Sequence, residues 1–260
     1  MTATVTLDIQ CPITLRAAGH SDGQPVSGHW SVDRALRLAL AFDAEISTYC
    51  RWTRLARSEA ELSNGHRVTY LLSSLARGGW VSAVTRRWPI VQVHLAEDHG
   101  EEGRGAPRIE IFVAPIRDEA APKQVAACLY ALRALVYTQR IASPNELRCA
   151  AHVAVEADSA SCTIVDVDTC ADPSRAIAAE LHRQSKLLSR GARVSPDIVR
   201  YDDREERALV LGARQPAASH VPTDPGLPPL HVDATWIARI RSEQLPPLHR
   251  SDLRSRRSAS

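Results

Sequence analysis

Hydrophobic and polar residues alternate strictly near the start of the chain. Apolar side chains occupy every second position from Val5 to Leu15, and mostly polar ones lie between them. A period of two is typical of a strand with one buried and one exposed face. Pro12 falls on the polar phase and has no N–H to donate. The pattern therefore predicts either an edge strand or two strands that meet at this proline.

A helical spacing follows after a polar loop. Ser31 is a suitable N-cap, and apolar residues recur at helical intervals over residues 32–55. We therefore predict a long helix over residues 31–57. The apolar residues of segment 68–75 predict a short second helix, which Gly78 and Gly79 would end.

From residue 90 onward one kind of unit recurs, in which two strands precede a helix. The predicted elements are strands 90–96 and 108–116 with helix 122–141, then strands 147–157 and 162–169 with a helix capped by Asp172 and begun by Pro173, and finally a hairpin of 198–201 and 208–211. Short connections between paired strands favour antiparallel pairing. The sequence thus predicts an α+β fold, with a largely antiparallel sheet built from strand–strand–helix units and helices on one face.

The composition changes after Gly212. Five prolines fall within residues 213–230, and the end of the chain is polar and basic. These features predict a single α+β domain over residues 1–212, a Pro-rich linker over 213–230, and a short helix with a basic tail over 231–260. The C-terminal tail is expected to be mobile, and its short helix should cover about Asp233–Glu243.

Charge and cysteine usage narrow the function classes. The 260 residues carry a net charge of +2, and of 32 cationic residues only Lys123 and Lys186 are lysines. This near balance excludes a strongly basic nucleic-acid footprint over the whole chain. The first residues lack a signal-peptide pattern and no apolar run is long enough for a membrane span, so we expect a cytoplasmic protein without a membrane partner. The six cysteines form no CxxC pair and are expected to be buried free thiols.

The polar face of the 147–169 hairpin carries the first candidate site. Matching the apolar positions of its two strands places His152 opposite Asp166, with Asp168 on the same face. An imidazole beside two carboxylates suits acid–base or metal chemistry, so these three residues are the candidate catalytic set. The competing interpretation is an ordinary solvent-exposed hairpin face. No metal site is assigned, and the sequence leaves any cofactor unknown.

The second candidate site is an anion or nucleic-acid site at Arg77, Arg86 and Arg87, which lie near two glycines and two tryptophans. Guanidinium groups and aromatic rings suit the binding of single-stranded nucleic acid. The alternative is that the glycines end a helix while the tryptophans fill the core. A further cluster, His94 with the acids and histidine of residues 97–102, is interpreted as a solvated loop.

No stretch carries a family-specific catalytic motif, and this decides the functional prediction. The leading prediction is a non-enzymatic cytoplasmic binding protein, an accessory, regulatory or assembly component that acts through its folded surface and its tail. Its expected partner is a protein, with a second copy of the chain and nucleic acid also considered. The first alternative is an enzyme that uses the polar face of the 147–169 hairpin. The second is a nucleic-acid-binding accessory protein that uses the arginines at 77–88 and the tail.

Overall fold

A computed structural model describes residues 3–13, 28–58, 67–99, 107–155, 160–213, 220–223 and 228–245. The helices are α1 (Gly28–Ala41), α2 (Ala121–Thr138), α3 (Pro173–Ser189) and α4 (Ala234–Ser242), with 3-10 turns η3 (Pro144–Glu146) and η4 (Val167–Thr169). The strands are β1 (Ala3–Pro12), β2 (Glu45–Ile46), β3 (Tyr49–Cys50), β4 (Trp52–Ser58), β5 (Arg67–Arg77), β6 (Trp80–Ser82), β7 (Arg87–His99), β8 (Pro107–Val113), β9 (Ile116–Asp118), β10 (Arg148–Ala154), β11 (Cys162–Val165), β12 (Asp197–Asp202), β13 (Arg207–Ala213), β14 (His220–Thr223) and β15 (Leu230–His231).

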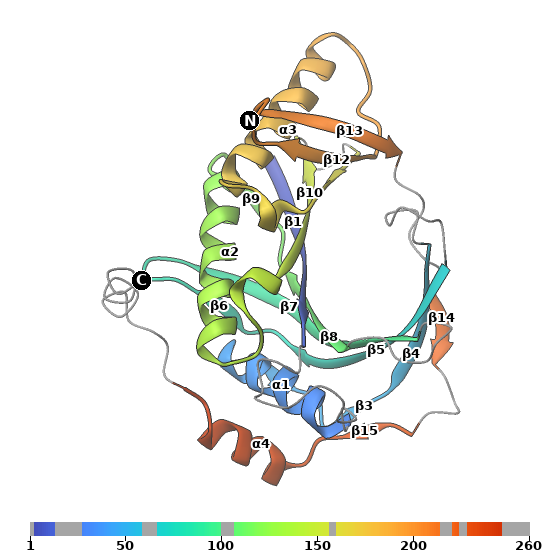
Figure 1. Ribbon diagram of the computed structural model, residues 1–260, viewed down its shortest axis with the longest axis vertical. Coiled ribbons are helices and arrows are strands. Elements are labelled where there is room, and N and C mark those ends of the chain that lie inside the picture. Colours follow the sequence, from blue (N-terminus) through green and yellow to red (C-terminus); the bar gives the residue numbers. More distant parts are fainter. Residues whose placement is uncertain are drawn as a thin grey trace.

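One large curved sheet organises the molecule. Its strand order is β13-β12-β11-β10-β1-β8-β7-β5-β4-β14, and the neighbours along this path pair antiparallel except β11 with β12. The sheet curls into an open arc, and α1, α2 and α3 lie along its convex side (Figure 1). The predicted fold class, an α+β fold with a largely antiparallel sheet and helices on one face, is confirmed.

The core lies between the sheet and these helices. The alternating residues Val5, Leu7 and Ile9 of β1 are at most 1% exposed, and they share one cluster with Leu36 of α1 and Leu129 of α2. The polar residues between them project from the opposite, concave face. The alternation near the start of the chain therefore separates a helix-covered face from a helix-free one.

Strand β1 lies inside the sheet, so the predicted edge position is wrong. It pairs with β10 on one side and with β8 on the other. Pro12 is the last residue of the strand, opposite Arg108, where its missing N–H removes at most a terminal bond of the ladder.

The two helices predicted between residues 31 and 75 are only partly present. Helix α1 ends at Ala41, Asp43 takes a left-handed φ of 59°, and β2, β3 and β4 follow. Segment 68–75 lies in β5, and therefore the predicted second helix is wrong. Strand β5 pairs on both sides and is fully inside the sheet, so its apolar residues need not alternate. Gly78 and Gly79 form the turn between β5 and β6 instead of ending a helix.

Most later elements match their predictions. Helix α2 and the β12–β13 hairpin lie where expected. Helix α3 has Asp172 as N-cap, with its Oδ1 accepting from the Ser174 N–H, and Gly191 has a positive φ of 71° after the helix. All six cysteines are free and buried. In the described part of the chain, no helix is long and apolar enough to cross a membrane.

The segments after residue 213 contact the rest of the sheet and α1. Strand β14 pairs with β4, and β15 pairs with β3. Helix α4 covers the predicted position and packs along α1 (Figure 1). We call residues 228–245 the C-terminal strap. The division of the chain at residue 212 and the mobility of the tail stay predictions, and residues 246–260 lie outside the described residues.

Candidate functional site

Polar side chains gather at the centre of the concave face, where β1, β8 and β7 run side by side. The strand register places Glu110 of β8 between Gln10 of β1 and His94 of β7. Arg108 and Gln92 are two residues away on the same face. We call Gln92, His94, Arg108 and Glu110 the central polar cluster. It lies in the middle of the sheet, opposite the helix-covered core.

His94 is a neutral, oriented imidazole in this cluster. Its side chain is only 9% exposed, its ring packs on Phe112 with centroids 5.1 Å apart, and its Nε2 lies 3.0 Å from Oε1 of Gln92. Burial lowers the pKa of His94 to about 4. Because the Gln92 oxygen only accepts, the proton belongs on Nε2, and Nδ1 carries a lone pair. That buried Nδ1 has no hydrogen-bond partner among the described residues.

Arg108 and Glu110 form a largely buried ion pair beside His94. Arg108 Nε donates to Glu110 Oε1 at 3.0 Å, and the two side chains are 12% and 6% exposed. Buried charges of this kind are maintained by pairing and hydrogen bonding. The cluster thus presents a carboxylate, a guanidinium and a neutral nitrogen lone pair within neighbouring register positions.

A polar pocket adjoins the cluster at the end of β5. It has a volume of about 420 Å³. Gln92, which binds His94, forms part of its wall, so the pocket and the cluster share a residue. The pocket is lined by Glu45, Ile46, Ser47, Thr48, Ser74, Arg77 and Gln92.

An exposed ion pair forms part of the wall of this pocket. Arg77 donates through Nε to Glu45 Oε2 and through Nη2 to Glu45 Oε1, both at 3.0 Å. The side chains are 70% and 68% exposed. Hydrogen bonding to Arg77 lowers the pKa of Glu45, so that the carboxylate is ionised at neutral pH.

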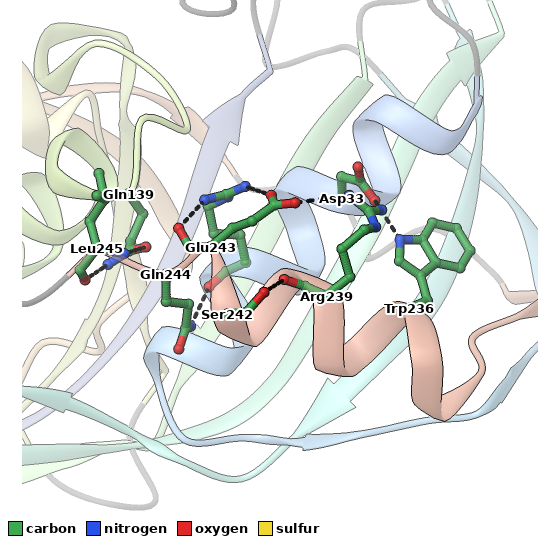
Figure 2. Close-up of polar contacts among 9 residues, drawn as sticks. Asp33, Gln139, Trp236, Arg239, Ser242, Glu243, Gln244 and Leu245 are labelled. Atoms are coloured by element: carbon green, nitrogen blue, oxygen red, sulfur yellow. Dashed lines mark hydrogen bonds and ion pairs between the residues drawn. The ribbon is translucent and has the colours of Figure 1, made fainter.

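The C-terminal strap holds the outer wall of the pocket in place. The Val232 N–H donates to the Thr48 carbonyl at 3.0 Å, next to the β15–β3 pairing. Farther along, Asp33 of α1 accepts hydrogen bonds from Trp236 Nε1 and from Arg239 (Figure 2). Glu243 continues the contact through a 2.6 Å bond from Arg37.

The end of the strap is bound to the end of α2. Gln139 Nε2 donates to the Leu245 carbonyl at 2.7 Å, and the Leu245 N–H donates back to Gln139 Oε1 at 3.4 Å (Figure 2). Gln139 is only 3% exposed. The strap therefore runs from the pocket wall, over α1, to the end of α2.

The predicted catalytic set has a different geometry from the expected one. His152 pairs with Thr163, and its Nδ1 lies 2.9 Å from the Thr163 hydroxyl, so the predicted register with Asp166 is wrong. Strand β11 stops at Val165 because Asp166 takes a left-handed φ of 55°. The carboxylate of Asp166 pairs with Arg200 at 3.2 Å.

The contacts of Asp168 stabilise the fold around η4. Its side chain is 3% exposed, and Oδ1 accepts from the Cys149 backbone N–H at 2.6 Å. Its backbone carbonyl accepts from Arg133. Burial raises the pKa of Asp168. The catalytic assignment of His152, Asp166 and Asp168 stays a prediction that these contacts do not favour.

The three arginines of the predicted anion site lie in different surroundings. Arg77 lines the pocket, whereas Arg86 lies 3.9 Å from Asp118 and Arg87 is exposed at the start of β7. Trp88 is 3% exposed and belongs to the core, while Trp80 is 44% exposed. Of the three arginines, Arg77 alone lines the pocket.

Sequence reasoning missed the central polar cluster. It assigned His94 to a solvated loop, but His94 is buried within β7. Residues 100–102 lie outside the described residues. The available signal was the polar phase of the strands, which carries Gln10 in β1 and Arg108 with Glu110 in β8. Only the strand order brings these positions together. No group of three or more His, Cys, Asp or Glu side chains suited to a metal is present in the described ranges.

Comparisons with known proteins match this chain to one component of an enzyme. The aspartyl/glutamyl-tRNA(Asn/Gln) amidotransferase B subunit of Thermus thermophilus is 29% identical in an alignment 252 positions long, gaps included, that covers 89% of this chain and 53% of the relative. The corresponding subunit of Moorella thermoacetica is 26% identical in a gapped alignment of 277 positions that covers 95% of this chain and 56% of the relative. That of Herminiimonas arsenicoxydans is 28% identical, covering 84% and 51%. The chain thus spans about half the length of the curated relatives it matches.

These matches overturn the leading functional prediction. A non-enzymatic accessory protein was expected because no catalytic motif was recognised, but the family model that matches residues 8–238 describes a catalytic domain. The enzyme alternative is the better of the sequence-based interpretations. The match begins inside β1 and ends inside α4, so it includes the central polar cluster, the pocket and most of the C-terminal strap. The chain belongs to the GatB/GatE catalytic domain family.

Proposed function

We propose that this chain is the catalytic domain of the B subunit of an amidotransferase that acts on aspartyl- or glutamyl-tRNA. Its concave face receives the aminoacyl end, and its protein partners are the other subunits of that enzyme. The relatives carry this activity and subunit designation in their names, and the family match spans 231 of 260 residues, from 8 to 238. The proposal gives nucleic acid the role of substrate and not that of a regulatory target.

The central polar cluster is the observation that carries the proposal. Amidation replaces one oxygen of a side-chain carboxyl group with the nitrogen of an amine donor, and that oxygen leaves as phosphate once a phosphoryl donor has activated the carboxylate. The site must therefore hold an anionic acceptor and an incoming N–H group. The guanidinium of Arg108 is positioned to attract the anion, and the Glu110 carboxylate and the lone pair on His94 Nδ1 can accept N–H hydrogen bonds. The low pKa of His94 keeps that lone pair available at neutral pH.

The burial of the cluster supports the same role. Glu110 and His94 are 4% and 9% exposed, which excludes most water around them. Fixed polar groups in such surroundings interact more strongly with a developing charge than the same groups in bulk water. We infer that Gln92 acts as a positioning residue, because its Oε1 fixes which nitrogen of His94 carries the proton.

A depletion and add-back assay tests the proposal. Extract of the source cells depleted of this chain would be given glutamyl-tRNA(Gln), and the amino acid released from the tRNA would be separated as glutamate or glutamine. We expect the wild-type chain to restore glutamine formation and the Glu110→Gln variant to lower the rate about 100-fold. Arg204→Gln, in the exposed turn between β12 and β13, serves as the matched control and should match the wild type.

The assay has two outcomes that contradict the proposal. One is a depleted extract that forms glutamine from glutamyl-tRNA as fast as the complete extract. The other is a restored extract in which folded Glu110→Gln works as well as the wild type. Aspartyl-tRNA(Asn) in a parallel assay separates the two acceptor classes named for the relatives.

A further inference from the structure

We infer that the pocket beside the central polar cluster is a binding site for a zwitterionic aminoacyl group. Arg77 takes its side-chain carboxylate and Glu45 takes its α-ammonium. The inference rests on the proposed function and names the feature of the substrate that the domain recognises. An aspartyl or glutamyl group joined to tRNA through its α-carboxyl has these two free charges and no other.

The charges of the pocket match those of the proposed ligand. The lining of the pocket contains one cation and one anion, Arg77 and Glu45, which are bonded directly to each other. A simple anion would be attracted by Arg77 and repelled by Glu45, and a simple cation the reverse. A ligand that carries both charges satisfies both residues. The planar guanidinium can bind a carboxylate through two parallel hydrogen bonds, as it now binds Glu45.

The ion pair between Arg77 and Glu45 can open at little cost in free energy. Both side chains are about 70% exposed, at 70% and 68%, so water already screens their attraction. When the ligand binds, the charge-assisted contact between Arg77 and Glu45 is lost, and each of the two residues gains such a contact with the ligand. Its polar atoms also meet the hydroxyls of Ser47, Thr48 and Ser74, which line the same pocket.

The pocket lies next to the central polar cluster. The pocket shares Gln92 with the central polar cluster, and Ser74 pairs with His94 in the strand register. A side-chain carboxyl held by Arg77 therefore lies beside the groups that we propose for the amidation. The volume of about 420 Å³ is sufficient for an amino-acid side chain and its ammonium group. The backbone bond from Val232 to Thr48 keeps the outer wall of the pocket fixed.

Binding of small esters to the full chain tests the inference without tRNA. The probe is L-glutamic acid α-methyl ester, which imitates the ester-linked group, and isothermal titration calorimetry measures its affinity. N-acetylation removes the ammonium, and glutamine methyl ester lacks the carboxylate. We expect each of these analogues to bind about tenfold more weakly than the probe, or worse. Free L-glutamate should also bind more weakly, because its second carboxylate lies near Glu45.

Two variants assign the charges to their residues. Arg77→Gln should lower the affinity for the glutamate ester about tenfold or more and remove its advantage over glutamine methyl ester. Glu45→Gln should remove the advantage of the free ammonium over the N-acetylated ester while keeping the preference for a carboxylate. Arg204→Gln, in the exposed turn between β12 and β13, is the matched control and should bind as the wild type does.

The outcomes separate this inference from the proposed function. Equal binding of the ester and its N-acetyl analogue by the wild type overturns the inference, as does unchanged selectivity in folded Arg77→Gln and Glu45→Gln. Free glutamate binding as tightly as the ester indicates a free amino acid as ligand and overturns the ester-linked assignment. Glutaminyl-tRNA formation without these effects leaves the proposed function standing alone. Ester binding as expected, with no amidation in the add-back assay, contradicts the proposed function and keeps the pocket as an amino-acid ester site.

Discussion

Two groups of charged side chains, one where the C-terminal strap meets α1 and one in the pocket, are held in different ways. Where the C-terminal strap meets α1, Asp33 accepts from both Trp236 and Arg239, and the helix that carries these two donors also buries Ile240 at 0% exposure. In the pocket, Glu45 and Arg77 have mainly each other and are open to water. Multiple contacts with burial stabilise the strap, whereas an isolated exposed pair contributes little to folding and is free to exchange partners.

The difference indicates which charges serve the fold and which serve the ligand. Substitutions that remove contacts of the strap should therefore lower the free energy of unfolding. Changes in the pocket pair, by contrast, alter ligand binding and leave folding intact. The expected effects on stability therefore fall from a few kcal/mol in the strap to almost nothing at the pocket pair.

Ile240→Ala in the strap should have the largest effect. The side chain is fully buried in the main core cluster, so its truncation removes apolar contacts and leaves a cavity. We expect the free energy of unfolding to fall by about 2–5 kcal/mol, measured by urea denaturation. Val210→Ala, at a position 51% exposed, is the control and should change it far less. Similar losses in the two variants would show that the strap is not part of the packed body.

The pH dependence of stability should report His94. Its pKa is about 4 in the folded chain and about 6.5 unfolded, so the unfolded state binds the proton first as the pH falls. The neutral folded form is therefore fully favoured above pH 6.5, and stability is lost between about 6.5 and 4. From the difference in pKa we expect this loss to be about 3 kcal/mol. His94→Gln should lack that part of the slope in urea unfolding curves, whereas the exposed control His231→Gln should keep it. An unchanged slope in His94→Gln would contradict the burial of this imidazole.

The turn that follows Arg77 offers a matched pair of glycines. Gly78 and Gly79 both have positive φ, but a Cβ on Gly79 would lie 2.4 Å from the Phe42 carbonyl oxygen, whereas nothing lies within 4 Å of one on Gly78. We expect Gly79→Ala to lose about 1–3 kcal/mol more than Gly78→Ala in thermal or urea unfolding. Equal losses would mean that the close approach of this turn to the end of α1 does not constrain the fold.

Sequence patterns predicted correctly those helices whose start is marked by a capping residue. Asp172 with Pro173 marked the start of α3, and Asp233 marked the start of α4. The same reasoning failed where tertiary context decides the outcome. The apolar spacing of 68–75 suits a helix as well as a strand buried inside a sheet, and β5 is the latter.

The candidate site was harder to predict than the fold. The central polar cluster lies on β7 and β8, and its neighbour Gln10 lies on β1, which is distant in sequence and joins the site only because β1 pairs with β8 in the sheet. Arg77 was selected from the sequence because it lies beside glycines and tryptophans, yet its relevant partner is Glu45, 32 residues away. A charge that is paired across the fold cannot be recognised from sequence spacing alone.

Glu45→Gln should have the smallest effect on folding. The carboxylate is exposed and its pKa is lowered only through Arg77, so water replaces the lost contact. We expect the urea midpoint to stay that of the wild type. Asp33→Ala in α1, by contrast, should lower the free energy of unfolding by about 1–3 kcal/mol, because two donors of the strap lose their acceptor. A large loss from Glu45→Gln together with none from Asp33→Ala would reverse the comparison.

The most direct test of the account is the affinity of the full chain for glutamyl-tRNA(Gln) and for the same tRNA without its amino acid, measured side by side at one salt concentration. A domain that recognises the aminoacyl group should bind the acylated tRNA several-fold more tightly. Glutamic acid α-methyl ester should compete away that difference, and Arg77→Gln should abolish it. Equal binding of the two tRNAs by the wild type, unaffected by the ester, would contradict the assignment of the concave face and its pocket to the aminoacyl end.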